Sequence, residues 1–430
     1  MKINTTLTAL VIGLASAAVT QALPPGPLVS SPNPVFISGS TAFRAQVYAG
    51  LQDMGLSPQS TDGSGNNIFT FTGTPNNNTL SNYQGGLDAN LTSGVVTVYC
   101  SFDGSAQGVD ECTVPTMQQN FEDVGHGGGV ATFTHGSDIA FSDVEQASTF
   151  FPSPTLNEII SVGAASTGVD QGIAVQPFMW GANQYAAAKI TSINNYQANN
   201  LLSAGQCGLN FWTGTNADYA TKIKLTGRDD TSGTRITAQQ LVPYLTGVAI
   251  VQWTVGGGVG TPNTAGNTGA WALAPADALG AHDSGYGSGG NVGKALGSLG
   301  VPGSDTSLVV GYVSFADGKG LVDAGALNAG TVQGSALIYD NINPILSTSP
   351  FEYNIPAVQN GSYPFWSYEH LYEGANVSTG SFIDADFGPG LVLGIDYEIS
   401  KQVLSTPQTA ILEENMDVYR QYDGGPINHF

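Results

Sequence analysis

The sequence has few basic residues. It contains 11 Lys and Arg residues against 33 Asp and Glu residues, which gives a formal net charge of -22. The field of such a chain repels nucleic acids and anionic membrane surfaces, so we exclude both as partners. A small anion remains compatible with this charge. A buried site binds it through short hydrogen bonds, while exposed charges are screened beyond about 8–10 Å.

Long apolar runs are absent after the N-terminal segment. No later stretch reaches the roughly 18 to 20 uninterrupted apolar residues of a membrane helix, so we expect no membrane insertion. The N-terminal segment combines Lys2, an apolar run from Leu7 to Val19 and the small-residue sequence Thr20-Gln21-Ala22. This pattern predicts a signal peptide over residues 1–22 and a periplasmic or secreted protein.

Cysteine is also scarce, with three residues in the chain. Cys100 and Cys112 bracket a short turn-rich segment, and in an exported protein their spacing favours a disulfide between them. Cys207 is then expected to be a buried free thiol.

The usual motifs of hydrolases are missing. No Gly-x-Ser-x-Gly sequence supplies a nucleophile, and the five histidines show no spacing typical of a metal site. We therefore predict no catalytic residue, no metal site and no cofactor, and a binding protein rather than an enzyme. A secreted phosphomonoesterase stays open as an alternative that a phosphatase assay would test.

Short strand-like runs alternate with helical patterns along the 430 residues, which indicates an α/β fold with mixed, mostly parallel sheets. The expected strands are Val35–Ser38, Val95–Cys100, Asp138–Phe141, Ile173–Gln176, Lys222–Thr226 and Leu308–Ser314. The expected helices are Thr41–Met54, Ser232–Leu245 and a part of Ile399–Tyr422. Two segments rich in Gly, Asn and Thr are expected to be surface insertions, Thr61–Thr79 and Trp253–Gly290.

Three of the four arginines lie beside small-residue turns. Arg228 and Arg235 enclose Asp229-Asp230-Thr231-Ser232-Gly233-Thr234, which follows a strand-like run and precedes a helical pattern. A helix start leaves backbone N–H groups unpaired and carries partial positive charge, so this segment presents donors to an oxyanion. Taken alone, the segment is also well explained as an ordinary helix cap.

Other polar turns follow predicted strands in the same way. A second small-residue turn ends at Arg44, and two such units facing each other would surround one anion. Ser142 and Asp143 end another strand, where ligands bind in open α/β sheets. Asp143 can accept a proton from monohydrogen phosphate, whereas sulfate would be repelled at a cost on the order of several kcal/mol. On its own segment, Asp143 is equally well explained as a helix cap. Ser105 lies in a further turn, over residues 103–108, and adds a hydroxyl donor.

In these segments the chain resembles the periplasmic phosphate-binding proteins of ABC phosphate transporters, which have the type II periplasmic binding protein fold. Four segments match in the same order, at residues 39–43, 104–108, 142–143 and 228–234. The Arg-x-Asp-x-Ser-Gly-Thr sequence of the last segment is the most specific. Residues 311–316 and 363–366 are also similar to late segments of that family, whereas Thr231 stands where the family usually has glycine.

The resemblance implies two α/β lobes with a ligand cleft between them, built from residues 33–176 with 335–430 and from residues 177–334. It implies that phosphate is bound by Ser40, Thr41, Phe43, Ser105, Asp143, Arg228, Ser232, Gly233 and Thr234. It also implies a local salt link of Arg228, transfer of the ligand's proton toward Asp143, and closure by hinge motion.

The expected partners are inorganic phosphate and the permease of an ABC transporter, and the protein is expected to be a monomer. The alternative function is that of a secreted surface or matrix protein that keeps the binding-protein fold without a transport role. Its long Gly- and Asn-rich loops and acidic surface would then be the relevant features.

Overall fold

The computed structural model describes residues 33–59, 67–75, 94–114, 118–124, 130–159, 172–242, 244, 246–262, 267–297, 301–322, 334–348, 351–378, 381, 383–402 and 408–430. The predicted signal peptide, residues 1–22, lies outside the described residues. Within these ranges, no helix combines the length and the apolar character that crossing a membrane requires.

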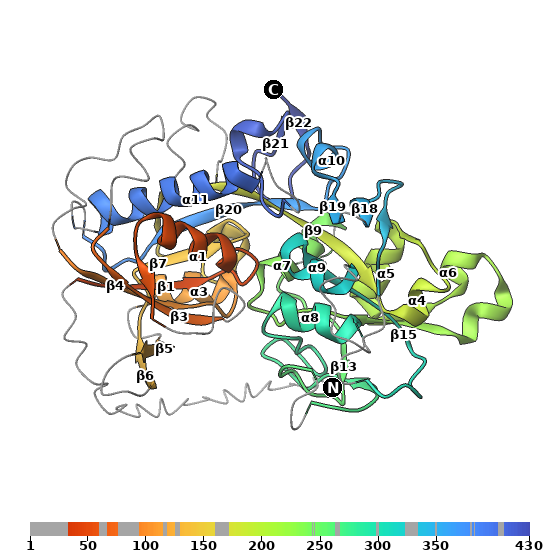
Figure 1. The fold of residues 1–430 in the computed structure, drawn as a ribbon. Coiled ribbons are helices and arrows are strands. Elements are labelled where there is room, and N and C mark those ends of the chain that lie inside the picture. The colour runs from red at the N-terminus through yellow and green to blue at the C-terminus, as the bar shows by residue number, and fades with distance from the viewer. Residues whose placement is uncertain are drawn as a thin grey trace, which may run out of the picture.

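A twelve-stranded mixed sheet extends through both halves of the molecule (Figure 1). Its main path has the order β11-β12-β15-β9-β20-β7-β1-β4-β3-β2, with β16 paired to β9 and β8 paired to β20. The strands are β1 (Pro34–Gly39), β2 (Ser57–Pro58), β3 (Ile68–Gly73), β4 (Val96–Ser101), β7 (Ile139–Ser142), β8 (Asn157–Ile159), β9 (Ala174–Ala182), β11 (Gln206–Gly208), β12 (Lys222–Thr226), β15 (Leu308–Ser314), β16 (Ser335–Ala336) and β20 (Trp366–Glu373).

The predicted α/β class with a mixed sheet is confirmed. Along the main path, β12–β15, β7–β1 and β1–β4 are parallel pairs, and the remaining pairs are antiparallel. Parallel pairing is therefore less widespread than the sequence suggested. All six predicted strands are present, with ends shifted by a few residues and with β9 extended to Ala182.

Helices connect and cover these strands. The longer ones are α1 (Arg44–Asp53), α3 (Ser105–Thr113), α5 (Asn195–Ala204), α7 (Gly233–Leu241), α8 (Gly289–Leu296), α9 (Phe315–Val322) and α11 (Gly388–Gln402). Short helices are α4 (Gln184–Ala187), α6 (Asn210–Thr213) and α10 (Ile355–Gln359). The predicted helix over 232–245 is α7, whose start is fixed by Ser232: the side chain of this residue accepts a hydrogen bond from the backbone N–H of Arg235.

Two large hydrophobic cores lie at the two ends of the sheet. The N-terminal core, on the left in Figure 1, is formed by β1, β3, β4, α1 and α11 and includes Val35, Phe69, Val98 and Leu391. The central core, on the right, includes Trp180, Leu225, Val310 and Phe365. β9 and β20 contribute to both, since Ala174 and Leu371 pack in the N-terminal core while Val175 and Tyr368 pack in the central core.

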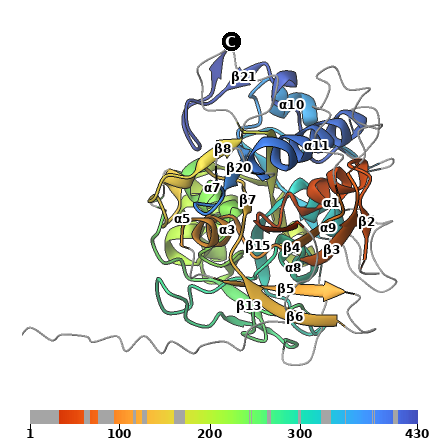
Figure 2. The same cartoon turned by 90° about the vertical axis from the view of Figure 1, so that its left-hand side faces the viewer.

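The strand β1 shows how the sheet is covered on both faces. Val35 and Ile37 point to the N-terminal core, whereas Phe36 points to the other face, because successive side chains of a strand alternate. There Phe36 packs against Phe121 and Phe133 of the hairpin β5 (Gln119–Val124) and β6 (Val130–His135). Figure 2 shows this hairpin on the side of the sheet opposite to α1 and α11.

Two segments differ from the sequence-based prediction. The helix expected within 399–422 is the end of α11, which stops at Gln402, and residues 413–419 form a short 3₁₀ turn and the strand β21 (Val418–Tyr419), paired with β22 (Asn428–His429). Residues 403–407 lie outside the described residues. Within the expected insertion 61–79, the described residues 68–73 form β3, a strand of the main sheet.

The predicted disulfide between Cys100 and Cys112 is wrong, because all three cysteines are free, buried thiols. Cys100 on β4 packs in the N-terminal core. Cys112 on α3 packs in a separate small cluster with Ala140, and its thiol donates to the carbonyl of Ser137. The short spacing in the sequence does not reveal that the strand and the helix bury these two side chains in different clusters. The prediction that Cys207 is a buried free thiol is confirmed.

Candidate anion-binding site

Three strand–turn–helix units meet near the middle of the molecule: β1 leads into α1, β4 into α3 and β12 into α7 (Figure 1). The first turn requires glycine at position 39. Gly39 has a φ of 115°, and a Cβ there would lie 1.9 Å from the carbonyl oxygen of Phe141 at the end of β7. The carbonyl of Gly39 accepts a hydrogen bond from the N–H of Gly104 at 3.0 Å, which joins the first turn to the second.

The second and third turns are in direct contact. The N–H of Ala106, in the first turn of α3, donates to the carbonyl of Thr231 at 2.9 Å, just before α7. A Cβ on Gly104 would lie 2.8 Å from the same carbonyl oxygen, and a Cβ on Gly233 would lie 1.9 Å from Oδ1 of Asp143. The starts of α3 and α7 are therefore packed against each other and against Asp143, with no room for a larger side chain at either glycine.

Arg228 is the buried cation of this site, with a relative exposure of 1%. Its Nε donates to the carbonyl of Tyr286 at 2.9 Å and its Nη2 to the carbonyl of Gly287 at 3.0 Å. Its Nη1 donates to the hydroxyl of Thr41 at 2.9 Å. A guanidinium has five N–H donors, so these bonds leave one N–H on each Nη atom. The expected salt link is not formed within the described part of the chain, where Arg228 has no ion-pair partner.

Asp143 is the buried carboxyl group of the site. Its Oδ1 accepts a hydrogen bond from the hydroxyl of Ser105, and its Oδ2 accepts one from the hydroxyl of Thr234 at 3.1 Å. Burial raises the pKa of Asp143, while the bond from Ser105, the charge of Arg228 and the bond from Thr234 lower it. Two hydroxyl donors, one carboxyl group and one guanidinium thus lie in a single buried cluster.

The segment around Tyr286 was not expected to contribute to the site. Residues 253–290 were interpreted as a surface insertion, yet they form the hairpin β13 (Trp253–Val255) and β14 (Trp271–Leu273) and then return to the site. Gly285 packs so closely on Arg228 that a Cβ would lie 2.2 Å from its backbone carbon. In the sequence, the available signal was an aromatic residue, Tyr286, within a glycine-rich stretch.

Glu369 on β20 is a second buried acid that the sequence analysis missed. It has a relative exposure of 0%, and neither carboxyl oxygen has a hydrogen-bond partner among the described residues. Burial raises its pKa well above the usual range, and the charge of Asp143 raises it further. A glutamate inside a strand that otherwise reads as buried, Trp366–Glu373, was a signal available in the sequence.

The structure brings most of the predicted site residues together, whereas the side chains of two others, Ser232 and Phe43, make structural contacts. Thr41, Ser105, Asp143, Arg228, Gly233 and Thr234 are joined by the contacts described above. The hydroxyl of Ser232 accepts a hydrogen bond as the cap of α7, and the ring of Phe43 packs in the N-terminal core against Phe141. The assignment of all nine residues as phosphate ligands remains a prediction.

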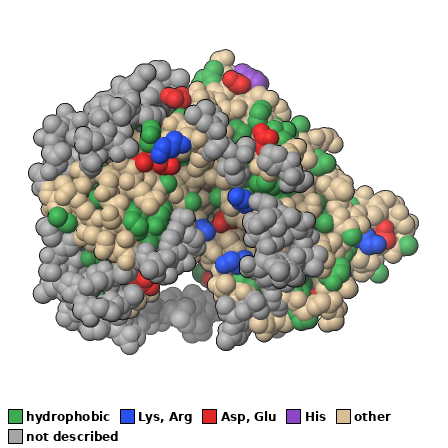
Figure 3. Space-filling view, in the orientation of Figure 1, with side chains coloured by type: hydrophobic (Ala, Val, Ile, Leu, Met, Phe, Trp, Pro, Cys, Tyr) green, Lys and Arg blue, Asp and Glu red, His purple; other side chains and the backbone are tan. Residues whose placement is uncertain are grey.

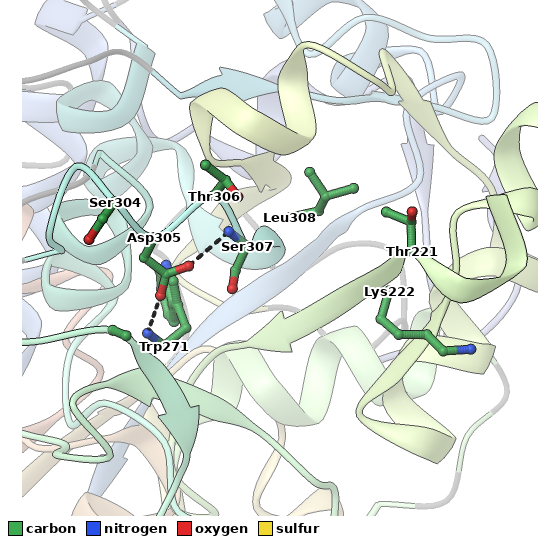
Figure 4. A pocket seen from close by; sticks show the side chains of 9 residues that line it. Thr221, Lys222, Trp271, Ser304, Asp305, Thr306, Ser307 and Leu308 are labelled. Carbon is green, nitrogen blue, oxygen red and sulfur yellow. Dashed lines mark hydrogen bonds between the residues drawn. The ribbon is translucent and has the colours of Figure 1, made fainter.

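A separate cavity of about 540 Å³ lies on the central half, away from this cluster, between the start of β12 and the segment before β15 (Figure 4). It is lined by Lys222, Trp271 and Asp305 among others, and the carboxylate of Asp305 accepts hydrogen bonds from the backbone N–H groups of Trp271 and Ser307 at 2.6 and 2.8 Å.

In Figure 3, basic side chains lie near a hollow between the two halves of the molecule.

Three acidic residues, one of them just before α7, lie close together. Carboxylate oxygens of Asp230, Asp277 and Asp283 are within 4.8 Å of one another, which is close enough for all three to contact a single cation. Asp283 already forms an ion pair with Arg235 at 2.7 Å, so part of this negative charge is neutralised by the protein itself.

Comparison with known proteins gives structural similarity without sequence similarity. No family model matches the chain, and no curated protein matches it. The chain is similar to a proposed phosphate ABC transporter substrate-binding protein with bound phosphate from Clostridium perfringens, at 14% identity and a TM-score of 0.43, covering 88% of this chain and 99% of that one.

Two further solved structures show the same kind of likeness. An ABC-type phosphate transport receptor from Vibrio cholerae has 12% identity and a TM-score of 0.37, covering 86% of this chain and 97% of that one. PstS from Borrelia burgdorferi has 13% identity and a TM-score of 0.36, covering 88% of this chain and 98% of that one.

Proposed function

We propose that this protein is an extracytoplasmic binding protein that captures inorganic phosphate where the three turns meet and delivers it to the permease of an ABC transporter. The observation that carries this proposal is Arg228. It is a buried guanidinium with no ion-pair partner among the described residues, and it keeps N–H donors beyond its three internal bonds. A buried charge of this kind is costly without a counter-ion, and a bound oxyanion would supply one.

The surrounding groups favour phosphate among the oxyanions. The hydroxyls of Ser105 and Thr234 donate to Asp143 in this structure and can turn toward a ligand oxygen. Monohydrogen phosphate carries a proton that it can donate to the Asp143 carboxylate. Sulfate is fully ionised at neutral pH and lacks that donor, so its charge would meet the carboxylate without a hydrogen bond.

Capture between two lobes also fits the position of these groups. Thr41, Ser105 and Asp143 follow strands next to the N-terminal core, whereas Arg228 and Thr234 follow β12 in the central core. The strands β9 and β20 run between the two halves in Figure 1 and are the candidates for the hinge. The lobe boundaries predicted above, and function as a monomer, remain part of this proposal.

The test is calorimetric titration of refolded, ligand-stripped protein with phosphate and then with sulfate. The proposal expects micromolar or tighter binding of phosphate, no detectable binding of sulfate, and loss of phosphate binding in the Arg228→Ala variant. Asp143→Asn is expected to weaken phosphate and to narrow the difference between the two anions, because an amide no longer repels sulfate. A folded protein that binds no phosphate would overturn the proposal and favour the surface-protein alternative.

A further inference from the structure

We propose that Glu369 is an additional ligand-binding residue of this site, and that its neutral carboxyl group, together with the hydroxyl of Ser40, forms hydrogen bonds to the anion beside Asp143. This inference rests on the proposed function, because it assigns a further contact to the same site. It adds a residue that lies outside the four sequence segments on which the family resemblance depends.

The register of β20 places Glu369 on the face of the strand that looks toward Asp143. Ser367 and Glu369 are two residues apart, so their side chains share one face of the strand. The hydroxyl of Ser367 donates to the carbonyl oxygen of Asp143 at 2.6 Å, which fixes that face against the end of β7. Burial of Glu369 is complete, and the charge of Asp143 acts on its carboxyl group.

Two polar groups at this place lack partners. Both carboxyl oxygens of Glu369 and the hydroxyl of Ser40 are buried, and none of them has a hydrogen bond of normal distance and angle among the described residues. The hydroxyl of Ser40 lies near the carboxyl group of Glu369, and their weak hydrogen bond lowers the pKa of Glu369. Leaving a buried polar group unpaired costs about 1–3 kcal/mol, so two such groups side by side indicate an absent partner that both can bind.

The neighbouring residue on β20 differs from Glu369 in its pairing. His370 is also completely buried, but its Nδ1 pairs with Glu158 at 2.5 Å and its Nε2 with Asp423 at 3.0 Å. Both ring nitrogens of His370 are thus paired within the protein, although the indole N–H of Trp366 on the same face has no partner among the described residues. The face that points toward Asp143 holds the unpaired carboxyl group.

A neutral Glu369 is the form that suits an anion. Burial raises its pKa well above the usual range and the charges of Asp143 and Asp423 raise it further, while His370 and Ser40 lower it. A protonated carboxyl group offers one O–H donor, whereas a carboxylate offers none and would repel the ligand. Asp143 would then accept the proton of the phosphate while Glu369 donates its own proton in a hydrogen bond to another phosphate oxygen.

This arrangement gives a specific pH dependence. Phosphate binding requires the protonated form of Glu369, so affinity is fully present below the pKa of Glu369 in the free protein and falls as the pH rises through it. The decrease cannot exceed tenfold per pH unit for one proton. Glu369→Gln keeps a neutral N–H donor of nearly the same shape and removes this titration.

The experiment measures phosphate affinity by calorimetry from about pH 6 to about pH 9 for wild-type protein, Glu369→Gln and Glu369→Ala. The ratio of wild-type affinity to Glu369→Gln affinity cancels the titration of phosphate itself. We expect this ratio to be near one while Glu369 is protonated and to fall once the pH passes the pKa of Glu369, and Glu369→Ala to bind about tenfold more weakly or worse at acidic pH. Infrared difference spectra on adding phosphate should show a shift of a protonated-carboxyl band that Glu369→Gln lacks.

Glu111→Gln is the matched control. Glu111 lies near the C-terminal end of α3 and is also a buried acid, but its carboxyl group accepts hydrogen bonds from Ser137 and Gln107. It should leave phosphate affinity unchanged, and thermal unfolding checks that each variant is folded. Phosphate binding that is equal in wild-type protein and both Glu369 variants at every pH would overturn this inference and leave the proposed function intact. Failure of folded wild-type protein to bind phosphate would overturn both.

Discussion

Arg228 and Arg235 lie seven residues apart, are both 1% exposed, and have opposite surroundings. Arg235 forms an ion pair with Asp283 at 2.7 Å and donates to the carbonyls of Asp283 and Val248. Arg228 donates to two backbone carbonyls and to the hydroxyl of Thr41, and no carboxylate pairs with it in the described part of the chain. Among the described residues, one buried cation forms a direct ion pair, and the other has carboxyl groups such as Asp143 and Asp229 only at longer range.

This difference separates a structural role from a binding role for two chemically identical side chains. A buried ion pair fixes the segment that carries Asp283 against the start of α7. A buried guanidinium without a counter-ion holds its remaining N–H donors in a fixed direction before any ligand arrives, which lowers the entropy cost of binding. The comparison therefore predicts that the two arginines fail in different assays when they are removed.

The largest expected effect is on phosphate binding by Arg228→Ala. Hydrogen bonds to a charged group contribute about 1.5–3 kcal/mol each, so the loss of two N–H donors weakens binding by at least about 100-fold. The unfolding free energy should change less than in Arg235→Ala, because no direct ion pair is broken and Asp143 loses only a longer-range attraction. Calorimetric titration and thermal unfolding of the same sample measure both quantities. Phosphate affinity within threefold of wild type would contradict a binding role for Arg228.

Removing Arg235 should affect stability first. Arg235→Ala leaves Asp283 buried without its partner, and breaking a buried pair in this way costs about 3–5 kcal/mol of unfolding free energy. Arg235→Lys retains the charge and is expected to lose less. Denaturant unfolding of both variants measures the costs, and titration of the fraction that remains folded should give near wild-type phosphate affinity. A stable Arg235→Ala protein that has lost phosphate binding would reverse the assignment of the two arginines.

A smaller effect is expected at Gly233, which lies between the two arginines. An added methyl group would lie 1.9 Å from Oδ1 of Asp143 and 2.5 Å from the hydroxyl of Ser105, so the start of α7 must move away. Overpacking costs about 1–3 kcal/mol. If Gly233 meets Asp143 only when the two lobes are closed on phosphate, this cost weakens phosphate binding by Gly233→Ala roughly 5- to 150-fold.

The matched control for Gly233 is Gly320→Ala on α9, where no atom lies within 4 Å of the added Cβ. Alanine in an exposed helical position stabilises a protein by about 0.5–1 kcal/mol relative to glycine, so the control should unfold at a slightly higher temperature and bind phosphate normally. Equal phosphate affinities of the two alanine variants would show that the contact between Gly233 and Asp143 has no part in binding.

The sequence predicted the strands and turns of the site better than their surroundings. Strand-like runs followed by small residues identified Thr41, Ser105, Asp143 and Arg228, because strand ends and helix starts have local signatures. Contacts made by distant segments have none. The carbonyls that hold Arg228 come from a glycine-rich stretch interpreted as a surface insertion, and Glu369 comes from a strand more than a hundred residues after Arg228.

The same limit applies to the errors in the fold. The disulfide between Cys100 and Cys112 was inferred from spacing alone, yet the two thiols belong to different clusters. Mostly parallel pairing was inferred from alternating strands and helices, yet β9 and β20 pair antiparallel with their neighbours. Pairing partners depend on tertiary packing, which a pattern along one segment does not encode.

The comparison of buried charges also applies to the acid Glu111, which is hydrogen-bonded within the protein. The smallest expected effect is on the pH dependence of its contribution to the unfolding free energy. Burial raises the pKa of Glu111 to about 7, even though bonds from Gln107 and Ser137 lower it. The folded state therefore holds one more proton than the unfolded state between about pH 4.5 and about pH 7, and stability falls as the pH rises through this window, by at most about 1.4 kcal/mol per pH unit. Glu111→Gln should remove that slope, which denaturant unfolding at several pH values measures. A slope unchanged from wild type would mean that Glu111 is ionised in the folded protein, because its hydrogen bonds then outweigh the cost of its burial.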